Sequence, residues 1–136
     1  MAELMLVLEA VLVAGLAAWM FVAVADNWRH PTLNEEAVAM VVRLDLMEEE
    51  YPEEFSQVAY RRIDDPKKIR AIYHLIRAAE PLAAVLLSLS AVLLLGAAAG
   101  GVAVTTATGL ARLSTAGFAS IWAAFIIGGN YFVYWY

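Results

Sequence analysis

The sequence predicts an all-α fold: an integral membrane helical bundle of about three transmembrane helices, with an amphipathic helical extramembrane segment between the first and the second. The chain of 136 residues is 62% hydrophobic, with a mean hydropathy of +0.67, which is too apolar for an ordinary soluble domain. The apolar residues gather in three runs, 4–25, 81–108 and 113–136, and only the first contains a charged side chain. Each run exceeds the roughly 20 residues that a helix needs to cross about 30 Å of hydrocarbon.

The whole chain, residues 1–136, is expected to form a single membrane domain. The first run lacks the basic start of a signal peptide, so we expect it to remain as an uncleaved anchor. Three crossings would place the two ends of the chain on opposite sides of the bilayer. In order, we expect helix 1 at about 4–25, the extramembrane segment at 26–68, helix 2 at about 66–100 and helix 3 at about 110–133.

The extramembrane segment has the pattern of a folded structure. After a turn at His30 and Pro31, Asn34 is expected to cap an amphipathic helix that lies on the membrane or on the other helices. Pro52 separates this helix from a second short one at 53–63. The apolar positions of the first helix are Ala37, Met40, Val41, Leu44 and Met47.

Helix 2 is expected to begin in water. Asp65 can cap it, and Pro66 takes the first helical position, where its missing N–H costs nothing. Pro81 then either kinks the helix at the interface or opens a separate membrane helix. Before that proline, spacings of four, three and three residues predict one interfacial polar face. Its members are Arg70, His74, Arg77 and Glu80.

Predicted helices 1 and 3 each contain one charged residue. Glu9 would lie about 7 Å below the membrane surface at helical rise, and Arg112 begins helix 3 on the same side. An ionised group in hydrocarbon is costly unless it is paired or hydrated, so we expect an intramembrane ion pair between them that fixes helix register. The alternatives are proton or ion handling by Glu9, and snorkelling of the side chains without a partner.

The remaining polar clusters are not expected to hold a cofactor or a metal. His30 and His74 would suit a pair of haem or pigment ligands, but both lie at the interface without a supporting motif, so ordinary hydrogen-bonding histidines are expected. An acidic run lacks the glycine turn of a calcium loop, and is expected to be a solvated face or a docking surface for a basic protein. The run comprises Glu48, Glu49, Glu50, Glu53 and Glu54.

Small residues and aromatic residues predict two further features. Small side chains let membrane helices approach closely, whereas aromatic side chains favour the level of the lipid headgroups. The expected helix-packing residues are Gly96, Gly100, Ala116, Ser120, Ala124 and Gly128. The expected aromatic belt, on the side of the extramembrane segment, consists of Trp28, Tyr131, Phe132, Tyr134, Trp135 and Tyr136.

Composition disfavours several classes of function. The chain has no cysteine, which excludes disulfides, thiolate metal sites and cysteine nucleophiles. A net charge of −5 argues against nucleic acid as a partner. No catalytic triad, paired catalytic carboxylate motif or nucleotide-binding loop occurs, so we expect no enzyme activity and no cofactor. The expected partners are the lipid bilayer and other membrane protein subunits.

A series of short motifs covers most of the chain. They comprise Asn27, Pro31, Asn34, Val38, Val41, Leu44, Asp45, Tyr60, Arg61, Arg62, Ile63, Pro66, Tyr73, Ile76, Glu80, Gly128, Gly129, Asn130, Tyr131, Phe132, Tyr134 and Trp135. These motifs resemble a bacterial family of predicted small integral membrane proteins of unknown function, domain of unknown function 2165. The sequence departs from that family in its short second connection, and it ends at Tyr136, where the family usually continues into a fourth membrane helix. The resemblance implies a topology and no established activity.

The resemblance also implies a multi-pass protein of the bacterial cytoplasmic (inner) membrane. Eight of the nine Lys and Arg residues lie between the apolar runs of helices 1 and 2, so the positive-inside rule places that segment in the cytoplasm. The family pattern instead implies the periplasmic side. We favour the periplasm, because these basic residues belong to a folded, net-acidic segment.

For function, we expect a non-catalytic accessory or structural subunit of a larger membrane protein complex. A respiratory or photosynthetic energy-transducing complex, and so electron transport, is the first candidate. The alternative is a small homo-oligomeric proton or cation transporter or channel that uses Glu9. A weaker alternative is a haem- or pigment-binding subunit that uses His30 and His74.

Overall fold

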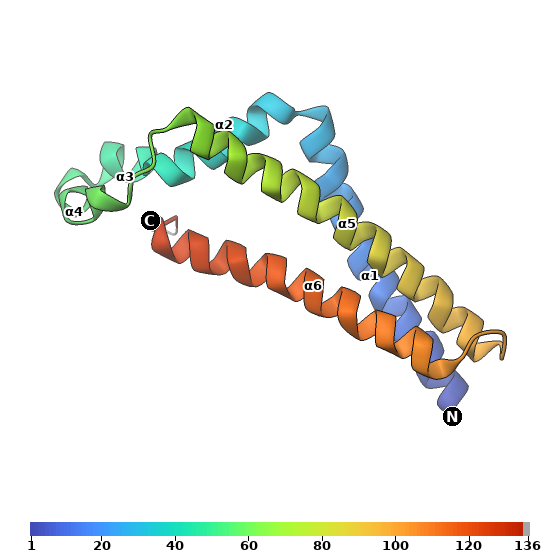
Figure 1. The fold of residues 1–136 in the computed structure, drawn as a ribbon. Coiled ribbons are helices and arrows are strands. Elements are labelled where there is room, and N and C mark those ends of the chain that lie inside the picture. The colour runs from blue at the N-terminus through green and yellow to red at the C-terminus, as the bar shows by residue number, and fades with distance from the viewer. Residues whose placement is uncertain (135–136) are drawn as a thin grey trace. The chain divides into compact units, whose positions relative to one another are not determined.

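The computed structural model describes residues 1–134, which form helices joined by short turns. Three of the helices, α1, α5 and α6, are long and apolar enough to cross a membrane. The elements are α1 (Ala2–Arg29), α2 (Pro31–Arg43), α3 (Asp45–Glu50), α4 (Pro52–Val58), a 3-10 turn η1 (Ala59–Arg61), α5 (Pro66–Ala98) and α6 (Val104–Tyr131) (Figure 1). The predicted all-α fold, with three candidate membrane helices and short helices between the first two, is confirmed.

The chain forms two compact units. The core unit comprises Met1–Ala25 and Ala78–Ile121, and the charged unit comprises Asp26–Arg77 together with the chain from Trp122 onward. Each unit has its own cluster of buried apolar side chains. Each boundary between the two units lies inside one of the three long helices, α1, α5 and α6, so each of these helices contributes residues to both units.

Small apolar side chains hold the core unit together. On α1 the buried positions follow spacings of four, three, four and three residues, which is one face of a helix. Many of the facing residues on α5 and α6 are alanines, which allow close approach of the helix backbones. The buried cluster consists of Leu6, Ala10, Val13, Ala17, Met20, Ala83, Ala84, Leu87, Ala91, Leu94, Ala97, Ala107 and Ala111.

The other apolar faces of the core unit are exposed. Leu12 and Val22, for example, are each 70% exposed. Side chains of this kind are stable in contact with lipid or with another membrane protein, and not with water. The exposure therefore agrees with the integral membrane character of the chain.

A glycine turn reverses the chain between α5 and α6. Gly100 has φ of +76°, the left-handed conformation that glycine adopts without steric cost. The N–H of Gly101 donates to the carbonyl of Gly96 at 2.9 Å, and the N–H of Gly100 donates to the carbonyl of Ala97 at 3.1 Å. These two bonds form a Schellman motif, which satisfies carbonyls left open at the end of α5. Gly100 is thus a helix-ending residue, and its prediction as a helix-packing residue was wrong.

Two membrane helices extend beyond their predicted limits. α1 continues to Arg29, past the last apolar residue of its run, and α6 begins at Val104 instead of near residue 110. Near the start of α6 the Thr108 hydroxyl donates to the carbonyl of Val104 at 2.8 Å, so its polar group is satisfied within the helix. Hydropathy identifies the apolar part of a helix and does not predict how far its polar ends extend.

The short helices of the charged unit begin and end at unexpected residues. α2 begins at Pro31, so Asn34 lies inside it and does not cap it; the Asn34 amide donates instead to the Asp26 carboxylate at 3.0 Å. The helix also ends before Met47, because Leu44 adopts a left-handed conformation with φ of 59°. Leu44 is only 2% exposed, so burial of its side chain offsets a backbone conformation that is uncommon for a residue with a Cβ. The helix predicted at 53–63 is α4 followed by η1.

Two contacts tie the charged unit together across the sequence. The N–H of Ile63 donates to the carbonyl of Val42 at 2.9 Å, beside the buried cluster that includes Val42 and Ile69. Tyr73 is 1% exposed, and its hydroxyl donates to the carbonyl of Asn27 at 3.0 Å. The second bond joins the end of α1 to α5.

α5 is a single helix that contains Pro81. The alternative of a separate membrane helix opening at this proline was therefore wrong. Proline has no N–H, so the carbonyl of Arg77 one turn earlier lacks its usual helical donor. The division between the two units falls at this turn, between Arg77 and Ala78.

Candidate functional site

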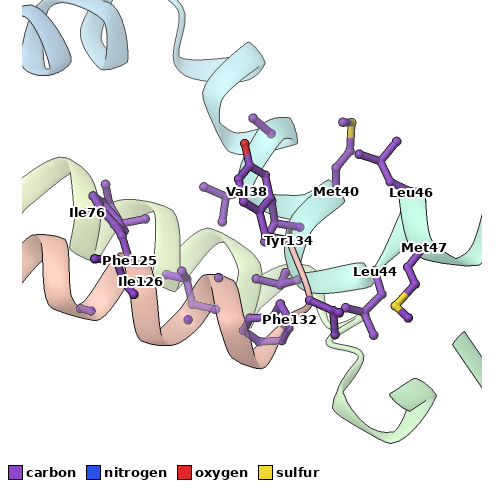
Figure 2. A pocket seen from close by; sticks show the side chains of 18 of the residues that line it. Val38, Met40, Leu44, Leu46, Met47, Ile76, Phe125, Ile126, Phe132 and Tyr134 are labelled. Atoms are coloured by element: carbon purple, nitrogen blue, oxygen red, sulfur yellow. The ribbon is translucent and has the colours of Figure 1, made fainter. Parts of the chain in front are cut away.

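The charged unit contains an apolar cavity of about 720 Å³ between α2, α3, α5 and α6 (Figure 2). Its lining includes Val38, Met40, Leu44, Leu46, Met47, Ile76, Phe125, Ile126, Phe132 and Tyr134. This volume lies within the range of roughly 300–1,000 Å³ that is typical of ligand sites. The cavity is the strongest candidate binding site among residues 1–134.

The sequence builds the cavity from three local features. The helical spacing of apolar residues on α2 directs Val38 and Val41 to one side of that helix. The break at Leu44 then redirects the chain, so that Met47 of α3 reaches the same cavity. On α6, Gly128 leaves room, since a Cβ added there would meet nothing within 4 Å.

The lining decides what the cavity can do chemically. Among the described residues that line it there is no Asp, Glu, His, Lys or Arg. Aliphatic and aromatic side chains supply its surface, and its methionines are flexible enough to adapt to different apolar shapes. The geometry suits the binding of an apolar group.

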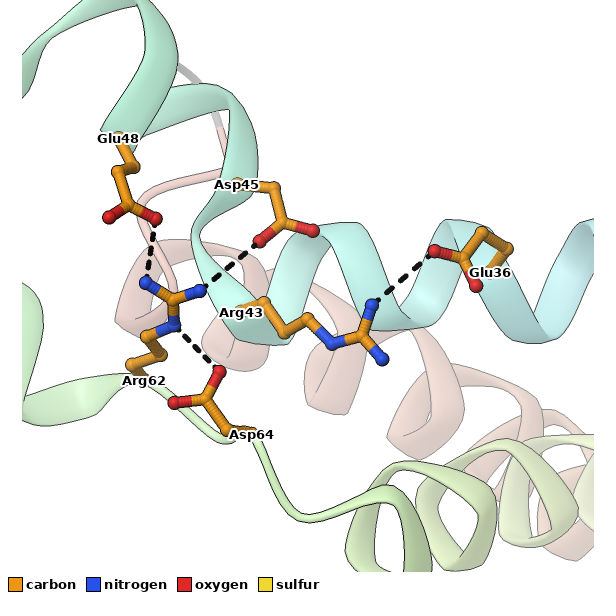
Figure 3. Close-up of polar contacts among 6 residues, drawn as sticks. All are labelled: Glu36, Arg43, Asp45, Glu48, Arg62 and Asp64. Carbon is orange, nitrogen blue, oxygen red and sulfur yellow. Dashed lines mark hydrogen bonds and ion pairs between the residues drawn. The ribbon is translucent and has the colours of Figure 1, made fainter.

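A cluster of ion pairs around Arg62 lies in the same unit (Figure 3). The Arg62 guanidinium donates to Glu48 at 2.6 Å and to Asp64 at 2.7 Å, and lies 3.8 Å from Asp45. The hydrogen bond to Asp64 is the largest of the effects that raise the pKa of Arg62 above its ordinary value. The cluster joins α3 to the segment that precedes α5.

The predicted acidic run is thus divided in two. All five glutamates are exposed, and of these Glu48 takes part in the Arg62 cluster. Within residues 1–134 no group of three or more His, Asp or Glu side chains is placed to hold a metal ion. The four glutamates outside the cluster remain a candidate docking surface for a basic protein.

The four residues of the predicted interfacial polar face do not share one surface. Arg70 is exposed and pairs with Glu35 of α2 at 3.2 Å, and His74 is exposed beside Tyr73. Glu80 is only 5% exposed and belongs to the core unit. The prediction was wrong for Glu80, because α5 passes into the core unit before this residue.

Arg77, the third member of that face, is half-buried over an aromatic ring. Its guanidinium carbon lies 4.3 Å from the ring centroid of Trp28, which is a cation–π contact. The sequence did not predict this pair, although both residues were singled out separately. The two residues are far apart in the sequence, and no sequence pattern indicated that they would be in contact.

Glu9 and Arg112 do not form the predicted ion pair. Both side chains are exposed on the core unit, and none of the ion pairs within residues 1–134 joins them. The reason is helix rotation. Glu9 precedes the buried Ala10 and Arg112 follows the buried Ala111, so each charge lies beside the packed face of its helix and not on it.

The two histidines show no shared site. His30 is exposed at the start of α2, and His74 borders a small hollow with Lys67 and Arg70. No hydrogen bond between the two histidines occurs in the described part of the chain. The structure therefore gives the haem or pigment alternative no added support.

The predicted small residues differ in what they contact. A Cβ on Gly96 would lie 2.9 Å from a methyl group of Val102, so a close approach requires glycine there. Ala116 and Ser120 are exposed, whereas Ala124 and Gly128 line the cavity. The sequence missed the buried pair Ser90 and Ser114, whose hydroxyl oxygens are 2.9 Å apart. Serines within otherwise apolar runs were the available signal.

The described aromatic residues of the predicted belt all belong to the charged unit. Tyr131 accepts a hydrogen bond at its carbonyl from Arg61 at 3.0 Å, and its ring packs on Phe132. Phe132 and Tyr134 line the cavity, and Trp28 contacts Arg77. Trp135 and Tyr136, the other two predicted members, lie outside the described residues.

Comparison with known proteins identifies a family. Residues 5–136 match the family model described as predicted small integral membrane protein (DUF2165). Neither the curated proteins nor the solved structures include a match to the chain. Since the match covers nearly the whole length, the chain belongs to the DUF2165 family of predicted small integral membrane proteins.

Proposed function

We propose that the protein is a non-catalytic accessory subunit of a larger membrane protein complex. The observation that carries this proposal is the apolar cavity of the charged unit, which has no ionisable lining and a volume of about 720 Å³. An apolar segment of a partner subunit fills it, because burial of apolar surface is the main driving force of such association. The four glutamates of the acidic run outside the Arg62 cluster add a docking surface for a basic region of the same partner.

The setting of this role is a further part of the proposal. The complex is an energy-transducing one of the bacterial inner membrane, with the charged unit on the periplasmic side. The family assignment supports the membrane location. The folded, net-acidic character of the segment supports the periplasmic side, since the positive-inside rule applies to simple loops.

The two alternative functions have less support. A transporter that uses Glu9 needs a polar path, and Glu9 lines neither the apolar cavity nor the small hollow beside His74. A haem- or pigment-binding subunit needs ligands that converge, and His30 and His74 make no described contact with one another. The cavity favours association over either alternative.

Purification from native membranes in a mild detergent tests the proposal. We expect a partner protein to co-purify with the tagged chain, and the Gly128→Leu substitution to reduce its recovery about tenfold by filling the cavity. Gly15→Leu is the matched control, because a Cβ on Gly15 also meets nothing within 4 Å and Gly15 is exposed on α1 and is not a lining residue of the cavity. A monomer or a simple homo-oligomer without a co-purifying protein would rule the proposal out.

A further inference from the structure

The core unit has four ionisable side chains, and two of them lie exposed among apolar neighbours. Glu3 is in the first turn of α1, near the end of the helix, and Glu80 is buried. The other two, Glu9 and Arg112, are surrounded on their helix surfaces by exposed side chains such as Leu12 and Leu113, which are 70% and 65% exposed. In a bilayer, this surface faces lipid or a second protein.

An isolated charge on such a surface is unstable. Hydrocarbon neither solvates it nor provides a hydrogen-bond partner, so charged residues of membrane helices generally pair or face water. Glu9 and Arg112 do not pair with one another within the chain. A partner of opposite charge from outside the chain would neutralise each of them without drawing water into the hydrocarbon.

The two charges lie at similar depths along the core unit. The rings of Trp19 and Phe118 are in contact, with centroids 5.7 Å apart, which places these two residues at one level. At helical rise, Glu9 lies about 15 Å from Trp19, and Arg112 lies about 9 Å from Phe118 in the same direction along the chain. The remaining difference of about 6 Å is within reach of a long arginine side chain.

The two helices also run in the same direction. In the core unit the N-terminus lies at the same end as the turn between α5 and α6, so α1 and α6 start together (Figure 1). Two copies of one chain insert into a membrane in the same orientation, because they carry the same topological signals. Glu9 of one copy then lies at a similar depth in the bilayer to Arg112 of a neighbouring copy.

We propose that the core unit binds a second copy of the same chain, with Glu9 of each copy paired with Arg112 of the other. A two-fold arrangement forms this pair twice, so both charges of both chains are neutralised. Exposed small residues on either side of Arg112, Gly109 and Ala116, allow the neighbouring helix to approach. The dimer is independent of the proposed accessory role, which concerns the cavity of the other unit.

Charge exchange between chains tests this dimer. A chain with Glu9→Arg presents two basic residues and a chain with Arg112→Glu presents two acidic ones, so each variant repels its own copy. A mixture of the two variants restores both pairs. Because the sequence has no cysteine, a single Ala2→Cys substitution allows donor and acceptor dyes to be attached at one place, and energy transfer in phosphatidylcholine vesicles reports association.

We expect energy transfer for the parent chain, a dimer affinity about tenfold or more weaker for either variant alone, and recovery for the mixture. Recovery in the mixture distinguishes pairing between chains from pairing within one chain, which mixing cannot restore. The neutral substitutions Glu9→Gln and Arg112→Gln make insertion easier and are expected to weaken the dimer as well, while Glu3→Gln leaves it unchanged. Undiminished energy transfer in the neutral variants, or no recovery in the mixture, would overturn the proposal, whether or not a different protein co-purifies from native membranes.

Discussion

At the scale of single residues, Arg62 is the most connected side chain of the charged unit. It contacts three carboxylates (Figure 3). Its guanidinium carbon also lies 5.9 Å from the ring centroid of Phe55. A guanidinium is suited to this role because its planar fork presents five N–H donors. The sequence indicated that acidic residues gather here, and it gave no sign of which basic residue they would surround.

We predict that Arg62→Ala lowers the stability of the charged unit by roughly 1–2 kcal/mol, since several partially exposed ion pairs and some packing are lost together. Thermal unfolding of the full chain in detergent, followed by circular dichroism, measures the change. Arg43→Ala is the control, because Arg43 makes a single 3.4 Å contact with Glu36, whose side chain is 63% exposed. Equal losses for the two variants would contradict the prediction.

Two further residues mark the limit of what the sequence could predict at this scale. The hydroxyls of Ser90 and Ser114 contact one another in the core unit. The Ser90 hydroxyl also lies in position to donate to the carbonyl of Leu86, and that of Ser114 to the carbonyl of Ala111. Each hydroxyl carries one hydrogen, so only one serine of the pair donates to the other at a given time. Their meeting depends on the rotation of two helices, which periodicity alone does not fix.

At the scale of elements, the long helices were predictable and the breaks between short ones were not. The apolar runs identify α1, α5 and α6 because only a helix of that length crosses hydrocarbon with its backbone bonds satisfied. The end of α2 at Leu44 has no such signal, since a left-handed helix end usually carries glycine or asparagine. The apolar spacing continues through this residue to Met47, which led to the prediction of one continuous helix.

Pro81 gives the prediction at this scale. Pro81→Ala supplies an N–H to the carbonyl of Arg77 and is expected to stabilise α5 by roughly 1–3 kcal/mol. Hydrogen exchange of the amides near residues 78–82, read by mass spectrometry, should slow by a matching factor. Pro66→Ala, at the first position of α5 where no helical bond is formed, should leave exchange unchanged. Exchange that is equally fast with and without Pro81 would refute this expectation.

At the scale of the whole molecule, composition alone decided the integral membrane fold, but the candidate site needed the structure. The apolar side of α2 was predicted from its spacing. That it meets the C-terminal part of α6 was not, because residues such as Val38 and Gly128 lie far apart in the sequence. The sequence likewise could not show which predicted helix-packing residues of α6 lie opposite α2. Ala124 and Gly128 line the cavity, whereas Ala116 and Ser120 are exposed.

The two lysines provide a test of orientation for the whole molecule. Lys67 and Lys68 are the only lysines of the chain, and both are exposed in the charged unit. With this unit in the periplasm, a membrane-impermeant amine reagent added to spheroplasts is expected to label both, as detected by peptide mass spectrometry. Labelling that requires lysis of the inner membrane would place the unit in the cytoplasm, as the positive-inside rule implies.

The bond between the Tyr73 hydroxyl and the carbonyl of Asn27 has a consequence for synthesis. These residues are 46 positions apart, so a ribosome finishes the first helix well before it makes the tyrosine that secures the helix end. Until then, the carbonyl of Asn27 must rely on water or on the insertion machinery for a donor. The N-terminal anchor is thus expected to enter the bilayer early but to reach its final form only after the next helix has begun to emerge.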